Sequence, residues 1–135
     1  MPRRKKRKVI GYEFALDLQE RAEKICRVLF PHINRQYFKC FRSRGSSARR
    51  TLARCHGLAK IMQKTIGCSA HYAIEFISER FDELTEQEQT KIIIHELMHI
   101  PCNFGGGFRH HDHVSDRNVE KLYRNYKKVL TGAEV

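Results

Sequence analysis

A chain of 135 residues, of which 41% are hydrophobic and 30% charged, is typical of one globular domain with a single core and excludes a disordered protein. No apolar run approaches the roughly 20 residues of a membrane-spanning helix, and no apolar signal segment follows the basic N-terminus, so we expect a cytoplasmic protein without a membrane partner. The net charge of +11 is uneven, because residues 1–54 carry 16 Lys and Arg against 4 Asp and Glu, which favours an attraction to polyanions.

Residues 1–11 form a basic arm that we expect to be disordered when nothing is bound, because neighbouring like charges repel. The globular domain is then expected to cover residues 12–131. Three functions fit such an arm: contact with nucleic acid, nuclear import in a host that has a nucleus, or solubilisation of the chain. The candidate contacts for nucleic acid in the arm are Arg3, Arg4, Lys5, Lys6, Arg7 and Lys8.

Residues 12–30 are expected to form the first helix. Apolar side chains recur there at three- and four-residue steps, as at Phe14, Leu18 and Ala22, and charged side chains mostly fill the opposite face. Pro31 then ends the helix.

Residues 36–44 alternate loosely and are rich in aromatic side chains, which predicts a strand. Gly45 and the two serines after it predict a turn, and residues 51–56 predict the strand that returns from it. A second basic cluster would then lie at the tip of this hairpin, as a further candidate contact for nucleic acid. It consists of Arg42, Arg44, Arg49 and Arg50.

The middle of the chain predicts a short helix over residues 58–66 and a strand over residues 71–78. In this strand Tyr72, Ile74 and Phe76 alternate with other residues, as they do in a strand with one buried face. The strand is expected either at the edge of the sheet, where an extended peptide could be added, or inside the sheet.

Two capping residues mark the remaining helices. Thr85 begins a capping box that opens a helix over about residues 86–99, and Pro101 helps to end it. Ser115 predicts the N-cap of a last helix that runs to about Leu130.

The five cysteines indicate no disulfide framework. Their number is odd, their spacing is wide, no CxxC pair occurs and no secretory signal is present, so we expect reduced thiols that are mostly buried. A second zinc site built from Cys40, Cys55, His56 and Cys68 is not expected, because the separations do not match the spacing of paired ligands.

The helix over residues 86–99 contains the motif HExxH. Because positions four apart on a helix lie one turn above each other, His95 and His99 are expected to present their imidazoles to one point. Two neutral imidazoles suit Zn²⁺, with one ion per chain. Glu96 would lie beside the ion, where its carboxylate can act as general base on the zinc-activated water and then protonate the leaving amine.

The alternative is that the two histidines and the glutamate merely occupy positions on an ordinary helix. This helix is otherwise strongly apolar, with three isoleucines directly before the motif. Burying three polar groups there without partners would be costly, so the motif favours a metal site.

A catalytic zinc site needs a third protein ligand. The long metzincin pattern would require Gly at position 102 and His at position 105, where this chain has Cys102 and Gly105, so that class is excluded. In a gluzincin the ligand would be a downstream glutamate on a helix, for which Glu120 is the candidate.

The glycine-rich loop over residues 103–113 offers histidines instead, because its glycines would let the chain fold back beneath the helix. We favour His111 as the third ligand, with His110 and His113 as alternatives. Arg109 or His113 could also polarise the carbonyl oxygen of a substrate.

Several segments resemble one family of metallopeptidases. The stretches IIHELMHIP, FGGGFRHHDHV and RNVEKLY within residues 71–126 resemble the metallopeptidases of archaea and phages, compact zincins related in outline to the SprT-like proteases. The segments LFPHI and CFRSRGSSARR resemble the same family, so the likeness covers nearly the whole chain after the arm. The family's Gly-Gly-x-Arg-x-His element implies that His111 is the third ligand. The resemblance implies a zincin fold and hydrolysis of peptide bonds, without a particular substrate.

We therefore expect a compact α+β, zincin-like domain with an N-terminal helix, a small twisted sheet of about three strands, the metal-bearing helix and a closing C-terminal helix. The expected function is zinc-dependent hydrolysis of polypeptides. Two alternatives are a SprT-like protease acting on nucleic-acid-bound proteins and a non-catalytic nucleic-acid-binding module with structural zinc. The sequence leaves the oligomeric state open.

Overall fold

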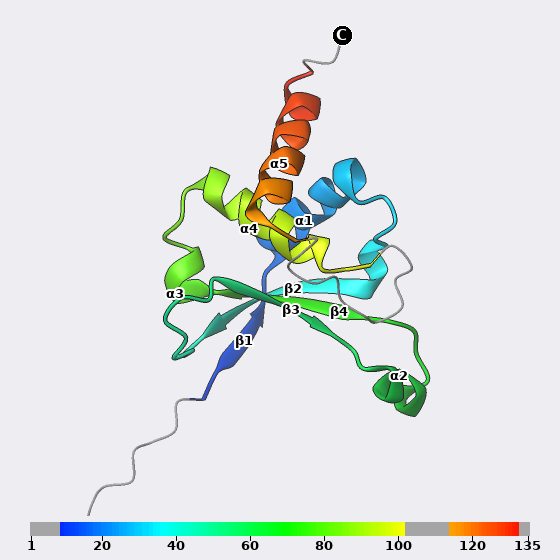
Figure 1. Ribbon diagram of the computed structural model, residues 1–135. Coiled ribbons are helices and arrows are strands. Elements are labelled where there is room, and N and C mark those ends of the chain that lie inside the picture. Colours follow the sequence, from blue (N-terminus) through cyan, green and yellow to red (C-terminus); the bar gives the residue numbers. More distant parts are fainter. Residues whose placement is uncertain (1–8, 102–113, 133–135) are drawn as a thin grey trace, which may run out of the picture.

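The computed structural model describes residues 9–101 and 114–132, and it confirms the expected α+β class (Figure 1). A four-stranded mixed sheet has the strand order β1-β2-β4-β3. The strands are β1 (Gly11–Phe14), β2 (Phe38–Arg44), β3 (Ala53–Gly57) and β4 (Tyr72–Ile77). The helices are α1 (Leu16–Leu29), the 3-10 turn η1 (Arg35–Tyr37), α2 (Lys60–Ile66), α3 (Ser78–Phe81), α4 (Glu86–Met98) and α5 (Asp116–Thr131).

The predicted hairpin between β2 and β3 is wrong. Both segments are strands, but β4 lies between them, pairing parallel to β2 and antiparallel to β3. Five of the six residues of β4 are buried, whereas β3 is only half-buried, so the more apolar strand occupies the inner position. Of the two positions expected for residues 71–78, the internal one is correct, and β3 is an edge strand among the described residues.

The start of the predicted first helix is also wrong. Residues 11–14 form strand β1, which pairs antiparallel with β2, and α1 begins only at Leu16. The side chains of Tyr12 and Phe14 are 63% and 48% exposed, so they do not extend the buried face that Leu18 begins. Pairing with β2 satisfies the backbone of this segment instead, and the sheet has four strands rather than about three.

Three helices cover one face of the sheet. In Figure 1, α1, α4 and α5 lie on the same side of the strands. The centre of the core between these layers is formed by residues with 0–1% exposure, which include Leu18, Ile25, Phe38, Ile74, Phe76, Ile93, Ile94 and Leu97. Arg21 of α1 links the helices by hydrogen bonds to Gln89 Oε1 (2.8 Å) and Thr90 Oγ1 (3.2 Å) of α4.

The predicted starts of α4 and α5 are confirmed. Thr85 Oγ1 accepts a hydrogen bond from the N–H of Glu88, and Ser115 Oγ accepts one from the N–H of Asn118, both at 3.2 Å. Each bond satisfies one of the backbone donors that a helix leaves unpaired at its first turn. These caps fix where α4 and α5 begin.

The short helix α2 is present, but it contributes no buried residue. Its apolar side chains Ile61, Met62 and Ile66 are 43–74% exposed. Among the described residues, no helix combines the length and apolar character that a membrane span requires.

Candidate metal centre

The last turn of α4 brings two imidazoles together. His95 and His99 are half-buried, and their ring centroids lie 5.2 Å apart with an angle of 70° between the ring planes. One ligand atom from each of His95, Glu96 and His99 lies within 4.8 Å of the other two. His99 follows the last residue of α4 but keeps a helical backbone, so the spacing of one turn is preserved. The three side chains are close enough to share one metal ion.

The carboxylate of Glu96 is held in an apolar environment between α4 and β3. The residue is 6% exposed, and this burial raises the pKa of its side chain to about 7. The backbone N–H of Cys55 donates a hydrogen bond to the carboxylate, which lowers the pKa but does not offset the burial. A carboxyl group with a pKa near neutrality can both accept and release a proton.

Cys55 is a neighbour of the site that no local sequence pattern indicates. Cys55 enters the sequence-based expectations only as a member of a second zinc site that is not expected, because nothing near it in the chain shows that β3 passes beside α4. Burial, with a further effect of the nearby Glu96, raises the pKa of its thiol to about 12, so the side chain stays protonated. The four cysteines within the described residues, Cys26, Cys40, Cys55 and Cys68, are free thiols, as expected.

The donor set fits a zinc ion. Zn²⁺ is bound by neutral imidazole nitrogens and by carboxylate oxygens, and both kinds of atom are present in this group. A carboxylate as buried as Glu96 is unfavourable when charged, and a divalent cation beside it would offset that cost. The residues present therefore agree with a catalytic metal site.

The loop candidates for the remaining ligand lie outside the described residues. These are Arg109, His110, His111 and His113. Close to the two ends of that segment, Ile100 and Val114 are 2% and 1% exposed and belong to the same core.

Glu120, the candidate ligand of the gluzincin pattern, has a different partner. Its Oε2 atom lies 2.8 Å from Nζ of Lys91, one turn before His95 on α4, and its Oε1 atom lies 3.6 Å from Nε of Arg124. The hydrogen bond from Lys91 is the main cause of the lowered pKa of Glu120. Glu120 is not part of the close group of His95, Glu96 and His99. It links α5 to α4 instead.

The second basic cluster is not the tip of a hairpin. Arg42 is already paired, because its guanidinium contacts both carboxylate oxygens of Asp17 (2.7 and 2.9 Å) and Oδ1 of Asp82 (3.1 Å). The hydrogen bond from Arg42 is the main cause of the lowered pKa of Asp17. The other three residues, Arg44, Arg49 and Arg50, are exposed. The six basic residues of the arm, Arg3, Arg4, Lys5, Lys6, Arg7 and Lys8, lie outside the described residues.

Comparison with known proteins agrees with this site. A family model described as "Putative phage metallopeptidase" matches residues 10–134. No curated protein and no solved structure matches the chain. The match covers nearly all of the sequence, including the metal motif and the strand beside it. The chain belongs to this phage metallopeptidase family.

Proposed function

We propose that the protein is a zinc-dependent peptidase that hydrolyses peptide bonds at the site formed by His95, Glu96 and His99. One observation carries the proposal: two imidazoles and a buried carboxylate converge within 4.8 Å in a member of a metallopeptidase family. His95 and His99 would hold the zinc. When bound, the ion supplies Lewis acidity, which lowers the pKa of a water ligand to about 7 and polarises a carbonyl group.

Glu96 would act as the general base and then as the general acid. Its carboxylate accepts a proton from the attacking water and later donates it to the nitrogen of the leaving amine. The hydrogen bond from the N–H of Cys55 fixes the orientation of the carboxylate, and burial keeps bulk water away from it. Both effects would keep the carboxylate in one position, so that the same oxygen atoms exchange the proton with the water and with the leaving amine.

His111 would complete the metal site, with His110 and His113 as alternatives. Ile100 and Val114, on either side of the loop segment, are anchored in the core that packs against α4. Arg109 or His113 would then polarise the carbonyl oxygen of the substrate. Zinc analysis of the three single His→Ala variants separates the candidates, because the true ligand is the one whose loss removes the metal.

The edge strand β3 would position the substrate. Because the N–H of Cys55 bonds to Glu96 rather than to β4, the outer side of β3 faces the carboxylate. An extended peptide added to this edge would gain backbone hydrogen bonds without a requirement for one sequence. A broad preference for unfolded polypeptide follows from this arrangement.

The test compares Glu96→Gln with Glu88→Gln, which removes the same charge from an exposed position on the same helix. With zinc-loaded protein and casein as substrate, we expect Glu96→Gln to lower kcat by roughly 10²- to 10⁴-fold while zinc content stays at one ion per chain. Glu88→Gln should retain full activity, and His99→Ala should lose both zinc and activity. Unchanged hydrolysis by Glu96→Gln would refute the proposal. If zinc removal also unfolds the chain, a non-catalytic module with structural zinc becomes the better explanation.

A more specific version is a protease that acts on nucleic-acid-bound proteins. The exposed Arg44, Arg49 and Arg50 and the excess of positive charge in residues 1–54 support it. It predicts faster cleavage of a DNA-binding protein when DNA is present, with a rate that falls as salt rises. The same cleavage rate with and without DNA would leave the general peptidase proposal intact and remove this version.

A further inference from the structure

The sheet has a second face, opposite α1, α4 and α5 (Figure 1). Since side chains along a strand alternate between faces, and since Phe38, Ile74 and Phe76 lie in the core under the helices, the residues between them point the other way. We call this surface the open face. It includes Tyr12 and Phe14 of β1, Lys39 and Phe41 of β2, Ala73 and Glu75 of β4, and Arg54 and His56 of β3, while Ser43 and Ile77 lie on the same face but are buried.

Aromatic rings lie exposed at one side of the open face. Phe14 and Phe41 are partners in the register of β1 and β2, and their ring centroids are 6.1 Å apart in an edge-on arrangement. The Phe14 side chain is 48% exposed and the next ring on the same strand, Tyr12, is 63% exposed. Single exposed rings are common on protein surfaces, whereas neighbouring exposed rings indicate a binding surface, because burying them against a partner is favourable.

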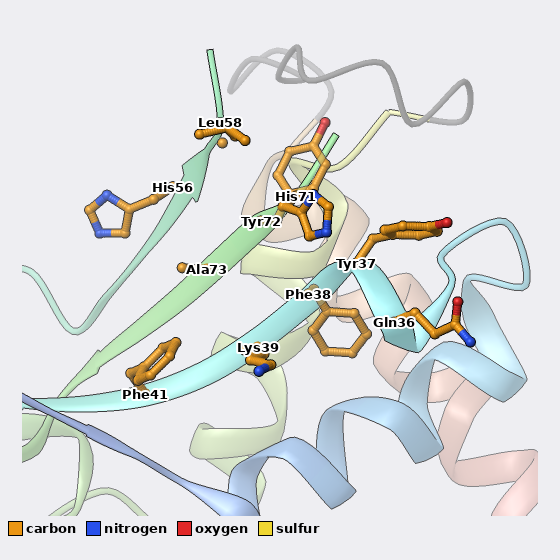
Figure 2. Close-up of a pocket in the computed structure, with 11 residues that line it drawn as sticks. Gln36, Tyr37, Phe38, Lys39, Phe41, His56, Leu58, His71, Tyr72 and Ala73 are labelled. Atoms are coloured by element: carbon orange, nitrogen blue, oxygen red, sulfur yellow. The ribbon is translucent and has the colours of Figure 1, made fainter. Parts of the chain in front are cut away.

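A pocket of about 410 Å³ extends from Phe41 to the N-terminal ends of β2 and β4 (Figure 2). Tyr37 and His71 stand at this end in edge-on contact, with ring centroids 5.2 Å apart. His71 Nδ1 donates a hydrogen bond to the carbonyl oxygen of Ser69 (2.8 Å), which leaves Nε2 able to bond a ligand. Lys39 and His56 line the same pocket. Lys39 supplies the positive charge of this pocket, while the bare Nε2 of His71 can accept a hydrogen bond from an amino or imino group of a base.

The charge on the open face is positive. Lys39 of β2 is exposed, and Arg54 of the edge strand β3, two strands away, is half-buried and opposite Glu75 in the register. Among the strand positions of this face that the structure describes, the acidic residue is Glu75, which is 2% exposed with its Oε1 atom 2.8 Å from Nε2 of His56. The face thus presents cations and aromatic rings to solvent, while its carboxylate is buried under a histidine.

This combination matches one class of partner. Single-stranded nucleic acid offers unpaired bases that stack on aromatic side chains and phosphates that bind Lys and Arg, whereas a duplex hides the faces of its bases. A four-stranded sheet with helices on one face can display such rings in a row. Lys39 is two residues from Phe41 on β2, or about 7 Å along the strand, so a base and a neighbouring phosphate can be contacted together.

We propose that the open face binds single-stranded nucleic acid, with bases stacked on Phe14 and Phe41, phosphates on Lys39 and Arg54, and one base in the pocket between Tyr37 and His56. This face is the one opposite α4, whose last turn carries the metal-motif residues His95, Glu96 and His99. The proposal does not depend on peptidase activity.

The test uses the full chain and fluorescent oligonucleotides of about 16 nucleotides, as oligo(dT), oligo(U) and a duplex of equal length. Phe14→Leu is the main variant, because it keeps an apolar contact with Phe41 and removes the stacking surface. The matched control is Leu130→Ala, which also trims a partly exposed apolar side chain but lies on α5. Lys39→Gln is compared with Lys121→Gln, which removes the same charge from an exposed site on α5.

The readout is the change that each substitution makes in single-strand and in duplex affinity, since the basic arm is identical in all variants and its stronger attraction to the duplex cancels in each comparison with the wild type. We expect Phe14→Leu to lower single-strand affinity roughly fivefold or more, with duplex affinity unchanged. Lys39→Gln should weaken single-strand binding and reduce its salt dependence, whereas Lys121→Gln and Leu130→Ala should change neither. Preference for oligo(dT) or oligo(U) identifies DNA or RNA as the source of the strand.

Two results would overturn the proposal. One is a single-strand affinity that Phe14→Leu leaves unchanged, or lowers no more than duplex affinity, in a variant whose circular dichroism matches the wild type. The other is a wild-type dimer that Phe14→Leu converts to a monomer, which would make the open face an interface between two copies. Glu96→Gln should bind oligonucleotide normally and Phe14→Leu should hydrolyse casein normally, so either proposal can fail without the other.

Discussion

The two faces of the sheet use the same strands for different purposes. On the helix-covered face, Phe38, Ile74 and Phe76 are buried at 0–1% exposure and support α4 with its metal motif. On the open face, Phe14 and Lys39 reach solvent. Because alternation along a strand separates these sets, a shift of one residue in register would exchange them. The pattern that builds the core therefore also decides which rings and cations remain for a partner.

The largest expected effect is on the free energy of unfolding, and it compares a ring on the helix-covered face with a ring on the open face. Phe76→Ala removes a ring with 0% exposure and should lower the free energy of unfolding by about 3–5 kcal/mol. Phe14→Ala removes a ring that is already half exposed, so the cost should be about 1 kcal/mol or less. Urea denaturation measures both. Equal losses would show that the open face is part of the core, and the contrast between the faces would not hold.

The next effect concerns the buried carboxylate of the helix-covered face. In metal-free protein, the raised pKa of Glu96 means that the folded state binds more protons than the unfolded state between the ordinary value of 4.5 and about 7. Stability should therefore fall as pH rises through this window, by about 3 kcal/mol in total, because each tenfold change in proton affinity corresponds to about 1.4 kcal/mol. Glu96→Gln should remove this fall.

Zinc provides the control for that measurement. Denaturation of the metal-free wild type and Glu96→Gln at both ends of the window should show the variant to be the more stable one only at the higher pH. Zinc at 100 times its Kd should then stabilise the wild type by about 2.7 kcal/mol. A metal-free wild type whose stability does not depend on pH across the window would contradict the burial of a charged Glu96.

A smaller effect is expected for Arg42, which joins the sheet to α1 and to the residues after α3. Arg42→Lys keeps the charge but loses the paired contact with Asp17, and we expect it to cost about 1 kcal/mol. Because Arg42 lowers the pKa of Asp17, the pair stabilises the fold above the ordinary pKa of the carboxyl group, and this contribution is lost as pH falls through the lowered value. The difference between wild type and Arg42→Lys should therefore shrink in acid. A difference that grows in acid would contradict the ion pair.

The smallest effect is expected for the substitution of Glu120, which should not change how much zinc the protein binds. Glu120→Gln should leave the zinc content unchanged, because the residue pairs with Lys91 and is not part of the close group at the metal motif. Zinc analysis beside His99→Ala provides the comparison. Loss of zinc from Glu120→Gln would restore the gluzincin assignment and require α5 to move toward the motif.

Local signals explain what could be predicted from the sequence. The caps at Thr85 and Ser115 and the four-residue spacing of His95 and His99 each depend on a few neighbouring residues, so α4, α5 and the metal motif were placed correctly. The pairing of β4 between β2 and β3 depends on contacts between distant segments, and a glycine-serine turn suggested a hairpin instead. The same limit hid Cys55, because its contact with Glu96 exists only once β3 has reached its place at the edge.

The inner position of β4 also has a consequence for synthesis of the chain on the ribosome. Before residues 72–77 leave the exit tunnel, β3 lacks its partner strand β4, and β2 can pair only with β1. A sheet of two strands alone is marginally stable in water. The sheet therefore closes late and around its last strand, and the residues that would cut peptide bonds emerge after it. The metal-motif residues His95, Glu96 and His99 are therefore synthesised only after all four described strands are available to pair.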